Sequence, residues 1–188
     1  MKTKTPLLFY AILILSFVGC KNGNQEKASS NVVQEVKDTK GKGQAFIKDD
    51  EATPNVLNIA IGSKDHTTLV AAVQAAGLEN SLVNAGPLMV FAPTNAAFDA
   101  LPEGTVESLL KPENKAKLAF ILKHHVTPGN YSKDFLRKFK KLGQASNESV
   151  TVEVKGNDVY VGGAKIIASI KAGNGIVHVV DKVILPTN

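Results

Sequence analysis

The sequence predicts one globular domain of the α+β class, preceded by a leader and a polar segment. Helical spacing of apolar residues dominates from residue 54 to about residue 124, whereas the alternation typical of strands dominates from residue 150 onward. Helices and strands that are segregated along a chain are typical of α+β folds. The chain of 188 residues has room for one such domain and additional segments.

The first half of the domain is expected to be mainly helical. An apolar segment over residues 56–61 ends at Gly62, and the next helix is expected to be capped by Asp65 and ended by Gly77. Its apolar face comprises Leu69, Ala72, Val73 and Ala76. The remaining helices are expected over residues 95–101, 105–110 and 112–124, the last with Pro112 in its first turn.

One buried strand interrupts these helices. Residues 88–92 form a short apolar run that Pro93 stops. The hydroxyl of Thr94 can cap the following helix, and Phe98 is placed to pack back beneath it. The side chains expected in the core include Phe91, Phe98, Val179 and Val183.

The last third of the chain is expected to form strands. Val150, Val152 and Val154 alternate with polar residues, which indicates a half-buried strand. Gly156-Asn157 provides a turn, and Gly162-Gly163 provides another. Further strands are expected over residues 159–161, 164–168 and 176–185. The last of these is apolar on both faces and is therefore expected to be central in the sheet.

The N-terminus, residues 1–19, is typical of a secretory signal peptide. Lys2 and Lys4 precede an apolar stretch over residues 7–18, which is too short to cross a bilayer that requires about 20 residues. Cys20 is the only cysteine, and residues 17–20 resemble a bacterial lipobox, with Phe17 in place of the usual Leu. We therefore expect Cys20 to be lipidated; the alternative is an ordinary signal peptide with an incidental cysteine. Two or three acyl chains would anchor the chain stably.

The segment over residues 20–53 is expected to be a flexible tether. After Cys20 it holds six Lys and six acidic residues among few large apolar side chains, so it cannot bury enough surface to order itself. An interaction arm is the alternative. Lys21 is not the Asp associated with retention in the inner membrane of some bacteria, which favours an outer-membrane location in the cell envelope.

Three separated motifs resemble signatures of the fasciclin domain family. Residues 90–98 (VFAPTNAAF) resemble the first signature, and residues 175–186 (GIVHVVDKVILP) resemble the closing one. Residues 122–129 (LKHHVTPG) resemble the Tyr-His segment between them. The similarity covers residues 54–188, which we assign as the fasciclin domain.

The resemblance implies a wedge of sandwiched β-sheets with helices packed around them, and a non-enzymatic adhesion or matrix-binding module. At two places the sequence differs from the family's pattern, which limits the functions that can be inferred from the resemblance. His124 stands where the family usually has Tyr, and Ser169-Ile170 stands where animal members carry the Asp-Ile pair tied to integrin recognition. Integrin binding is therefore not expected. Thr94, Phe98, His125 and His178 fall within the signatures, and we expect their roles to be structural.

The sequence offers little that indicates catalysis, a metal or a cofactor. It contains neither a G-x-S-x-G nor an H-E-x-x-H motif, and a single cysteine excludes an internal disulfide and a four-cysteine zinc site. Trp is absent, and the net charge of +5 is too small to indicate nucleic-acid binding. We expect no enzyme activity and no cofactor. His178, inside an apolar strand, is expected to be hydrogen-bonded and neutral, and His66 is expected to be exposed.

A basic segment over residues 132–141 is the candidate partner-binding surface. On a continuous helix, Lys133, Arg137, Lys140 and Lys141 would share one face, with Leu136 and Phe139 nearer the core. Such a face is either merely solvated or a patch for anionic glycan, lipopolysaccharide or phospholipid head groups.

Three classes of function remain open on the sequence. A lipid-anchored binding module, with a protein or an anionic glycan as partner, is the leading hypothesis. A small-molecule carrier or sensor would need an apolar pocket between sheet and helices. An enzyme would need titratable groups within mutual reach in a cleft.

Overall fold

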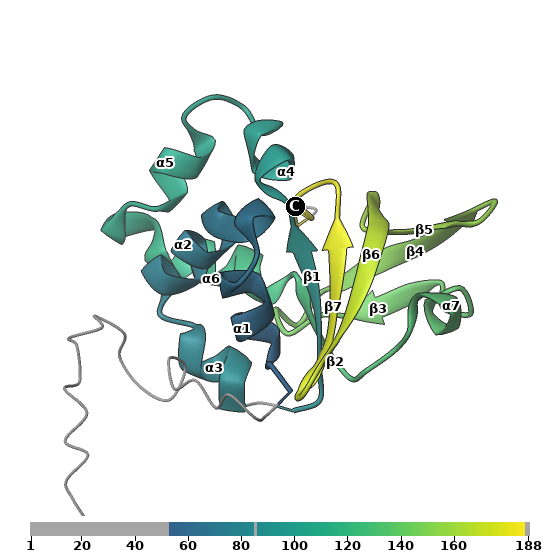
Figure 1. Ribbon diagram of the computed structural model, residues 1–188. Helices are drawn as coiled ribbons and strands as arrows, with labels where there is room; N and C mark the ends of the chain where they lie inside the picture. Colours follow the sequence, from purple (N-terminus) through teal and green to yellow (C-terminus); the bar gives the residue numbers. More distant parts are fainter. Residues whose placement is uncertain (1–52, 85, 187–188) are drawn as a thin grey trace, which may run out of the picture. The chain divides into compact units, whose positions relative to one another are not determined.

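A computed structural model describes residues 53–84 and 86–186. The predicted leader, the predicted lipidation site Cys20 and almost all of the predicted tether lie outside the described residues. Within them, a layer of helices covers one side of a strongly curved sheet (Figure 1). The α+β class is confirmed.

The helices gather mainly in the first half of the chain. They are α1 (Val56–Ile61), η2 (Lys64–His66), α2 (Thr67–Ala76), α3 (Glu79–Asn84), α4 (Asn95–Asp99), α5 (Thr105–Leu109), η3 (Pro112–Asn114), α6 (Lys115–Lys123) and α7 (Lys133–Leu136). Gly77 ends α2 in the left-handed region at φ 69°, as expected of a glycine there. The expectation for Asp65 was wrong: it lies inside η2, and Ser63 caps that turn instead.

Seven strands form one sheet. They are β1 (Leu88–Pro93), β2 (Val126–Pro128), β3 (Lys141–Gly143), β4 (Ser149–Lys155), β5 (Asp158–Val161), β6 (Ala164–Ala172) and β7 (Gly175–Val180), in the order β2-β1-β7-β6-β5-β4-β3. β7 pairs in parallel with β1 and antiparallel with β6, so the expected central position of the last strand is confirmed. That strand ends at Val180 rather than at residue 185.

The sheet curls until its two edge strands approach each other. Ala145, which follows β3, donates its backbone N–H to the Val126 carbonyl in β2 over 2.7 Å. The sandwich expected from the family resemblance is thus made by one sheet folded on itself. This bond brings the sheet close to a closed barrel, which reduces the exposed edge.

Two hydrophobic cores lie on the two faces of β1 and β7. Leu88, Val90 and Val177 face the helices and pack with α1, α2 and α6. Met89, Phe91 and Val180 face the interior of the curled sheet, which is filled by side chains of β3, β4, β5 and β6. Because successive side chains of a strand point to opposite faces, two buried faces require the uninterrupted apolar sequence seen in both strands.

Two of the four expected core residues are less buried than predicted. Phe91 is fully buried and Val179 is buried, which confirms those two. Phe98 and Val183 are only half-buried, so placing them inside the core was wrong. Phe98 packs against the helix-side core while staying partly open to solvent.

Candidate functional site

His178 is held in the interior of the curled sheet by two hydrogen bonds. Its Nε2–H donates to the Tyr131 carbonyl over 2.9 Å, which leaves Nδ1 to accept from the Ser169 hydroxyl over 2.7 Å. Its ring stacks on Phe91 at a centroid distance of 5.7 Å. Burial lowers the pKa of His178 below its usual value, against the opposing effect of the Tyr131 carbonyl. The expected burial and hydrogen bonding of this histidine are confirmed.

His125 is also buried, with both ring nitrogens satisfied by backbone groups. Its Nδ1–H donates to the Ile121 carbonyl over 2.8 Å, and its Nε2 accepts from the Ile184 N–H over 2.9 Å. The ring thereby ties the end of α6 to the residues that follow β7. Burial lowers the pKa of His125 to about 4. Both nitrogens of this ring are therefore bonded to backbone groups of separate parts of the fold.

His66 and His124 are buried as well. The prediction that His66 is exposed was wrong: its Nδ1 contacts the Ser63 hydroxyl over 2.8 Å, and its Nε2 lies near the Ala92 backbone without making a hydrogen bond among the described residues. His124 contacts the Ser146 hydroxyl over 3.0 Å. Burial lowers the pKa of both imidazoles, with Asp65 and Glu148 respectively opposing the shift.

The Ser169–His178 contact has the separation of a nucleophile and its base, but lacks the rest of a hydrolytic site. The imidazole is oriented by a carbonyl, and its pKa is lowered by burial. A triad places a carboxylate at the position that the Tyr131 carbonyl occupies here. Across residues 53–84 and 86–186, no group of three His, Cys, Asp or Glu side chains is arranged to hold a metal ion.

Thr94 caps α4 as expected, since its hydroxyl accepts from the Ala97 N–H over 3.3 Å. The adjacent Asn95 side chain accepts from the Thr68 N–H over 3.1 Å and donates to the Lys64 carbonyl over 3.0 Å. These contacts join α4 to η2 and to the start of α2. The residues of the first signature therefore connect elements of the fold.

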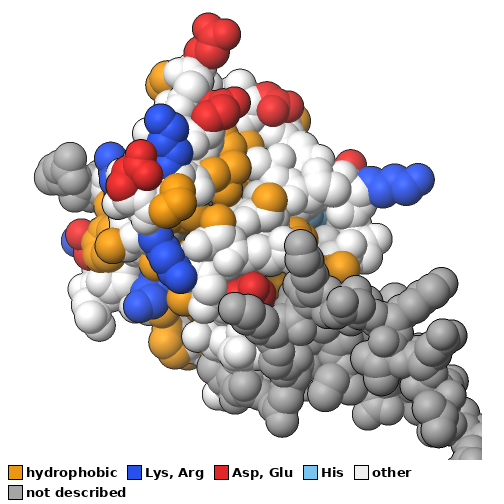
Figure 2. Space-filling view, turned by 90° about the vertical axis from the view of Figure 1, so that its left-hand side faces the viewer, with side chains coloured by type: hydrophobic (Ala, Val, Ile, Leu, Met, Phe, Trp, Pro, Cys, Tyr) orange, Lys and Arg blue, Asp and Glu red, His pale blue; other side chains and the backbone are white. Residues whose placement is uncertain are grey.

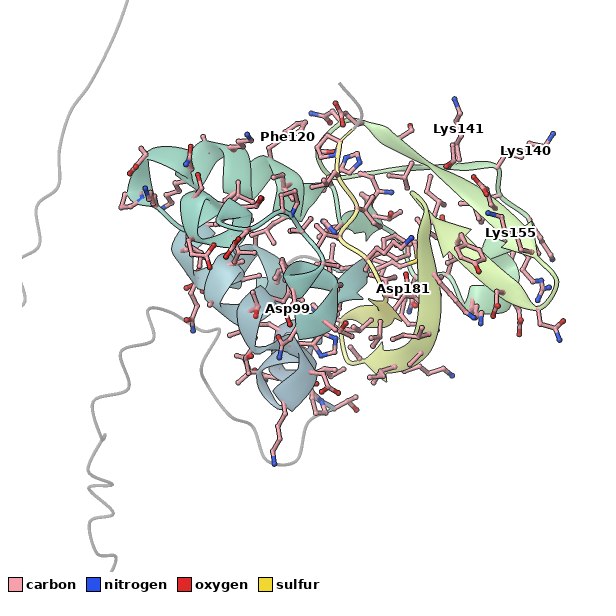
Figure 3. All side chains as sticks on the ribbon, turned by 90° about the horizontal axis from the view of Figure 1, so that it is seen from above. Asp99, Phe120, Lys140, Lys141, Lys155 and Asp181 are labelled. Atoms are coloured by element: carbon pink, nitrogen blue, oxygen red, sulfur yellow. The ribbon has the colours of Figure 1, made fainter. Side chains whose placement is uncertain are left out.

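The basic segment does not form the continuous helix that was expected. Leu136 is fully buried and α7 ends there, so the four cations do not share a helical face. Arg137 donates to the Gly156 carbonyl over 2.6 Å. The pKa of Asp158 on β5 is lowered mainly by its hydrogen bond to Lys165, and Lys133 and Arg137 add smaller contributions. Figure 3 shows Lys140 and Lys141 pointing outward from the strand side of the domain.

A cluster of three aromatic rings lies over α7. Tyr131 and Phe135 stack at 5.5 Å, and Phe139 contacts them at 5.2 and 5.5 Å. The Lys138 ammonium lies 5.1 Å from the centre of the Phe135 ring. Phe135 is 43% exposed, although Leu136 beside it is fully buried. An exposed aromatic ring stacked on a half-buried one, with a cation over it, is residue chemistry enriched at contact surfaces.

Beside this cluster lies a surface hollow of about 540 Å³, which we call the aromatic hollow. It is lined by Asn130, Tyr131, Ser132, Phe135, Lys171, Ala172, Gly175 and Ile176. Aromatic walls and one exposed cation make this hollow the strongest candidate for contact with a macromolecule.

A second candidate site is an apolar cavity of about 200 Å³ between the helices and the sheet. Its walls come from α1, α2, α3, α6, β1 and β7, and nearly all of them are apolar. Exposed hydrophobic side chains also gather on the helical face of the domain, flanked by charged residues (Figure 2). Among the described residues, no helix is long and apolar enough to cross a membrane.

The aromatic hollow was not predicted from the sequence, although the sequence contains a pattern that indicates part of it. Tyr131, Phe135 and Phe139 recur every four residues, which is the spacing of side chains that meet on one helical face. Lys171 carried no such signal, because only the pairing of β6 with β7 brings it beside residues some 40 positions earlier. The apolar cavity had no signal, since its residues are ordinary core positions.

Comparison with known proteins agrees with these observations. The family model described as the fasciclin domain matches residues 64–186. The protein sll1483 of Synechocystis is 46% identical over 72% of this chain and 76% of its own length. The transforming growth factor-beta-induced protein ig-h3 of Sus scrofa is 36% identical over 79% of this chain, which spans only 22% of that protein. A solved FAS1 domain pair from the insect cell adhesion molecule fasciclin I matches 62% of this chain and 43% of its own, with 21% identity and a TM-score of 0.49.

Proposed function

The chain belongs to the fasciclin domain family, and from that premise we propose that it is a non-enzymatic adhesion or macromolecule-binding module of the cell envelope. The aromatic hollow carries this proposal. Its stacked Tyr131 and Phe135 and its exposed Lys171 offer both apolar contact area and positive charge. Aromatic contact area with a positive charge beside it suits a protein or an anionic glycan as the partner.

The electrostatics of the strand side support an anionic partner. Lys171 lies in the hollow, Lys138 lies over the Phe135 ring, and Lys140 and Lys141 are exposed nearby in the sequence. Lys133 and Arg137 are only half-exposed, and Arg137 is bound to the Gly156 carbonyl, so they offer less free charge than the sequence suggested. Attraction of this kind raises the rate of encounter with a polyanion and weakens with salt.

A lipid anchor at Cys20 completes the proposal. An acylated N-terminus would hold the domain at an envelope surface, at the outer membrane, on a tether of about thirty residues. Tethering raises the effective concentration of the domain against partners on the same or a facing surface, so modest affinity suffices.

The proposal is tested by attachment of living cells. Bacteria producing the full chain should attach to a surface coated with an anionic polysaccharide such as dextran sulfate more than bacteria producing residues 1–53 alone. Neutral dextran is the matched surface control, and added salt should reduce the difference. Equal attachment by both strains, with both chains present in the membrane fraction, would refute the function.

We also propose a second candidate function, the binding of a small apolar molecule, because one specific observation favours it. The apolar cavity lies between sheet and helices, where a carrier or sensor would bind its ligand. The two functions use different faces and do not exclude each other.

A further inference from the structure

We infer that the apolar cavity binds a single-chain amphiphile, an unbranched hydrocarbon tail carrying one carboxylate. The inference rests on the second candidate function and names its ligand class. The tail would lie among the side chains of α1, α2, β1 and β7, and the carboxylate would lie at the mouth beside Lys123.

The walls of the cavity exclude a polar ligand. Leu57, Leu69, Val73 and Leu122 are buried in them, together with Val90 and Val177 of the sheet. His125 also lines the cavity, but both of its ring nitrogens already bond to backbone groups and its low pKa keeps it neutral. A polar ligand group inside would lose its hydration without gaining a partner, which is costly.

The mouth of the cavity differs from its walls. Three lining residues are exposed, namely Ser81 on α3, Lys123 at the end of α6 and Ala145, so we place the mouth of the cavity beside them. Within residues 53–84 and 86–186, the side chains of Ser81 and Lys123 make no hydrogen bond or ion pair. A cation and a hydroxyl at the rim of an apolar cavity are complementary to an anionic head with an apolar tail.

The volume of the cavity sets the length of the tail. A cavity of about 150 Å³ holds the six carbons of benzene, so one of about 200 Å³ holds roughly eight carbons. Affinity should therefore rise about fourfold for each methylene added up to about octanoate, and then level off. This levelling off distinguishes a bounded cavity from an open apolar surface, on which affinity keeps rising with the length of the tail.

The experiment is calorimetric titration of the full chain with the carboxylates from hexanoate to dodecanoate, and with octanol as the neutral probe. Lys123→Gln should weaken octanoate binding about tenfold and leave octanol binding unchanged. Lys111→Gln, at an exposed lysine outside the cavity, is the matched control and should change neither.

A cavity-filling variant gives an independent readout. Val70 is half-buried on α2 and lines the cavity, so Val70→Phe should abolish the binding of both probes, whereas Val70→Ala should keep it. Thermal melting of each variant checks that it folds, and the chain-length series on the unaltered chain does not depend on any variant.

The outcomes separate the inference from the function on which it rests. The inference is supported if affinity stops rising near eight carbons and if Lys123→Gln loses only the preference for octanoate over octanol. Octanol bound as tightly as octanoate, with both lost in Val70→Phe, overturns the carboxylate assignment and leaves a neutral apolar ligand. If neither probe binds the unaltered chain, the inference and the second candidate function both fail.

Discussion

Acidification should destabilise this domain through His125, and the size of the effect follows from the structure. Burial lowers the pKa of His125 from 6.5 to about 4, while in the unfolded chain the ring takes up a proton near pH 6.5. As far as His125 is concerned, the free energy of unfolding is therefore highest above pH 6.5. It falls as the pH decreases from 6.5 to 4, and below pH 4 it is lower by about 3 kcal/mol. At pH 5 the loss from this group is about 2 kcal/mol.

The assay is urea denaturation at pH 8 and pH 5, on the unaltered chain and on His125→Leu. The variant leaves the Ile184 N–H and the Ile121 carbonyl without their partner, so it should be less stable at pH 8. It also removes the titration, so its stability should fall by about 2 kcal/mol less between pH 8 and pH 5.

The other three histidines contribute in the same direction, because burial lowers the pKa of His66, His124 and His178 as well. The contributions of His66 and His178 are common to both chains and cancel in the comparison, whereas the charge of His124 helps to lower the His125 pKa and so belongs to the measured effect. An equal loss of stability on acidification in the two chains would refute the reasoning. An NMR titration showing the His125 ring protonated near pH 6.5 in the folded state would refute it without any variant.

Three further predictions concern the fold and the anchor. Phe98→Ala should cost about 1–2 kcal/mol, rather than the 3–5 kcal/mol of a fully buried ring, because Phe98 is half-buried; a chemical denaturation midpoint measures it. Gly175→Ala should cost more than about 3 kcal/mol, since the new methyl would meet the Leu88 carbonyl, whereas Gly143→Ala, with open space around it, should change stability by less than about 0.5 kcal/mol. Cys20→Ala should release the chain from membranes or leave an uncleaved precursor, and a mature chain whose intact mass lacks acyl groups would contradict the anchor.

The sequence predicted the fold best where patterning and packing agree. The apolar run at residues 88–92 and the alternation at Val150, Val152 and Val154 each correspond to a strand, and Gly77 ends its helix in the left-handed conformation. These signals are local, since they depend on side-chain spacing and on the backbone freedom of glycine.

The errors arose where distant contacts override local spacing. Periodicity extended the basic segment into a helix, but Leu136 is drawn fully into the core, α7 stops there, and Lys141 joins β3. His66 looked exposed beside a helix start, yet the packing of η2 against α4 buries it. Asn174 had no signal at all, although its side chain accepts from the Val56 N–H and donates to the Leu82 carbonyl.

For the same reason, the candidate sites could be predicted only in part. The aromatic residues of the hollow lie close together in sequence, whereas Lys171 reaches them through the β6–β7 pairing. The cavity depends on how well the helices fill the space over β1 and β7, which is a property of three-dimensional packing and not of any motif.

The most direct test of the central claim, contact through the aromatic hollow, is the attachment of cells that produce the full chain with Phe135→Ser and Lys171→Glu together. Phe135 is 43% exposed and Lys171 is exposed, so the double variant should keep its melting temperature. Lys111→Glu, on the helical side, is the matched charge control. Attachment to dextran sulfate should fall at least about tenfold in the double variant and stay unchanged in the control. Undiminished attachment by a folded double variant would contradict the account.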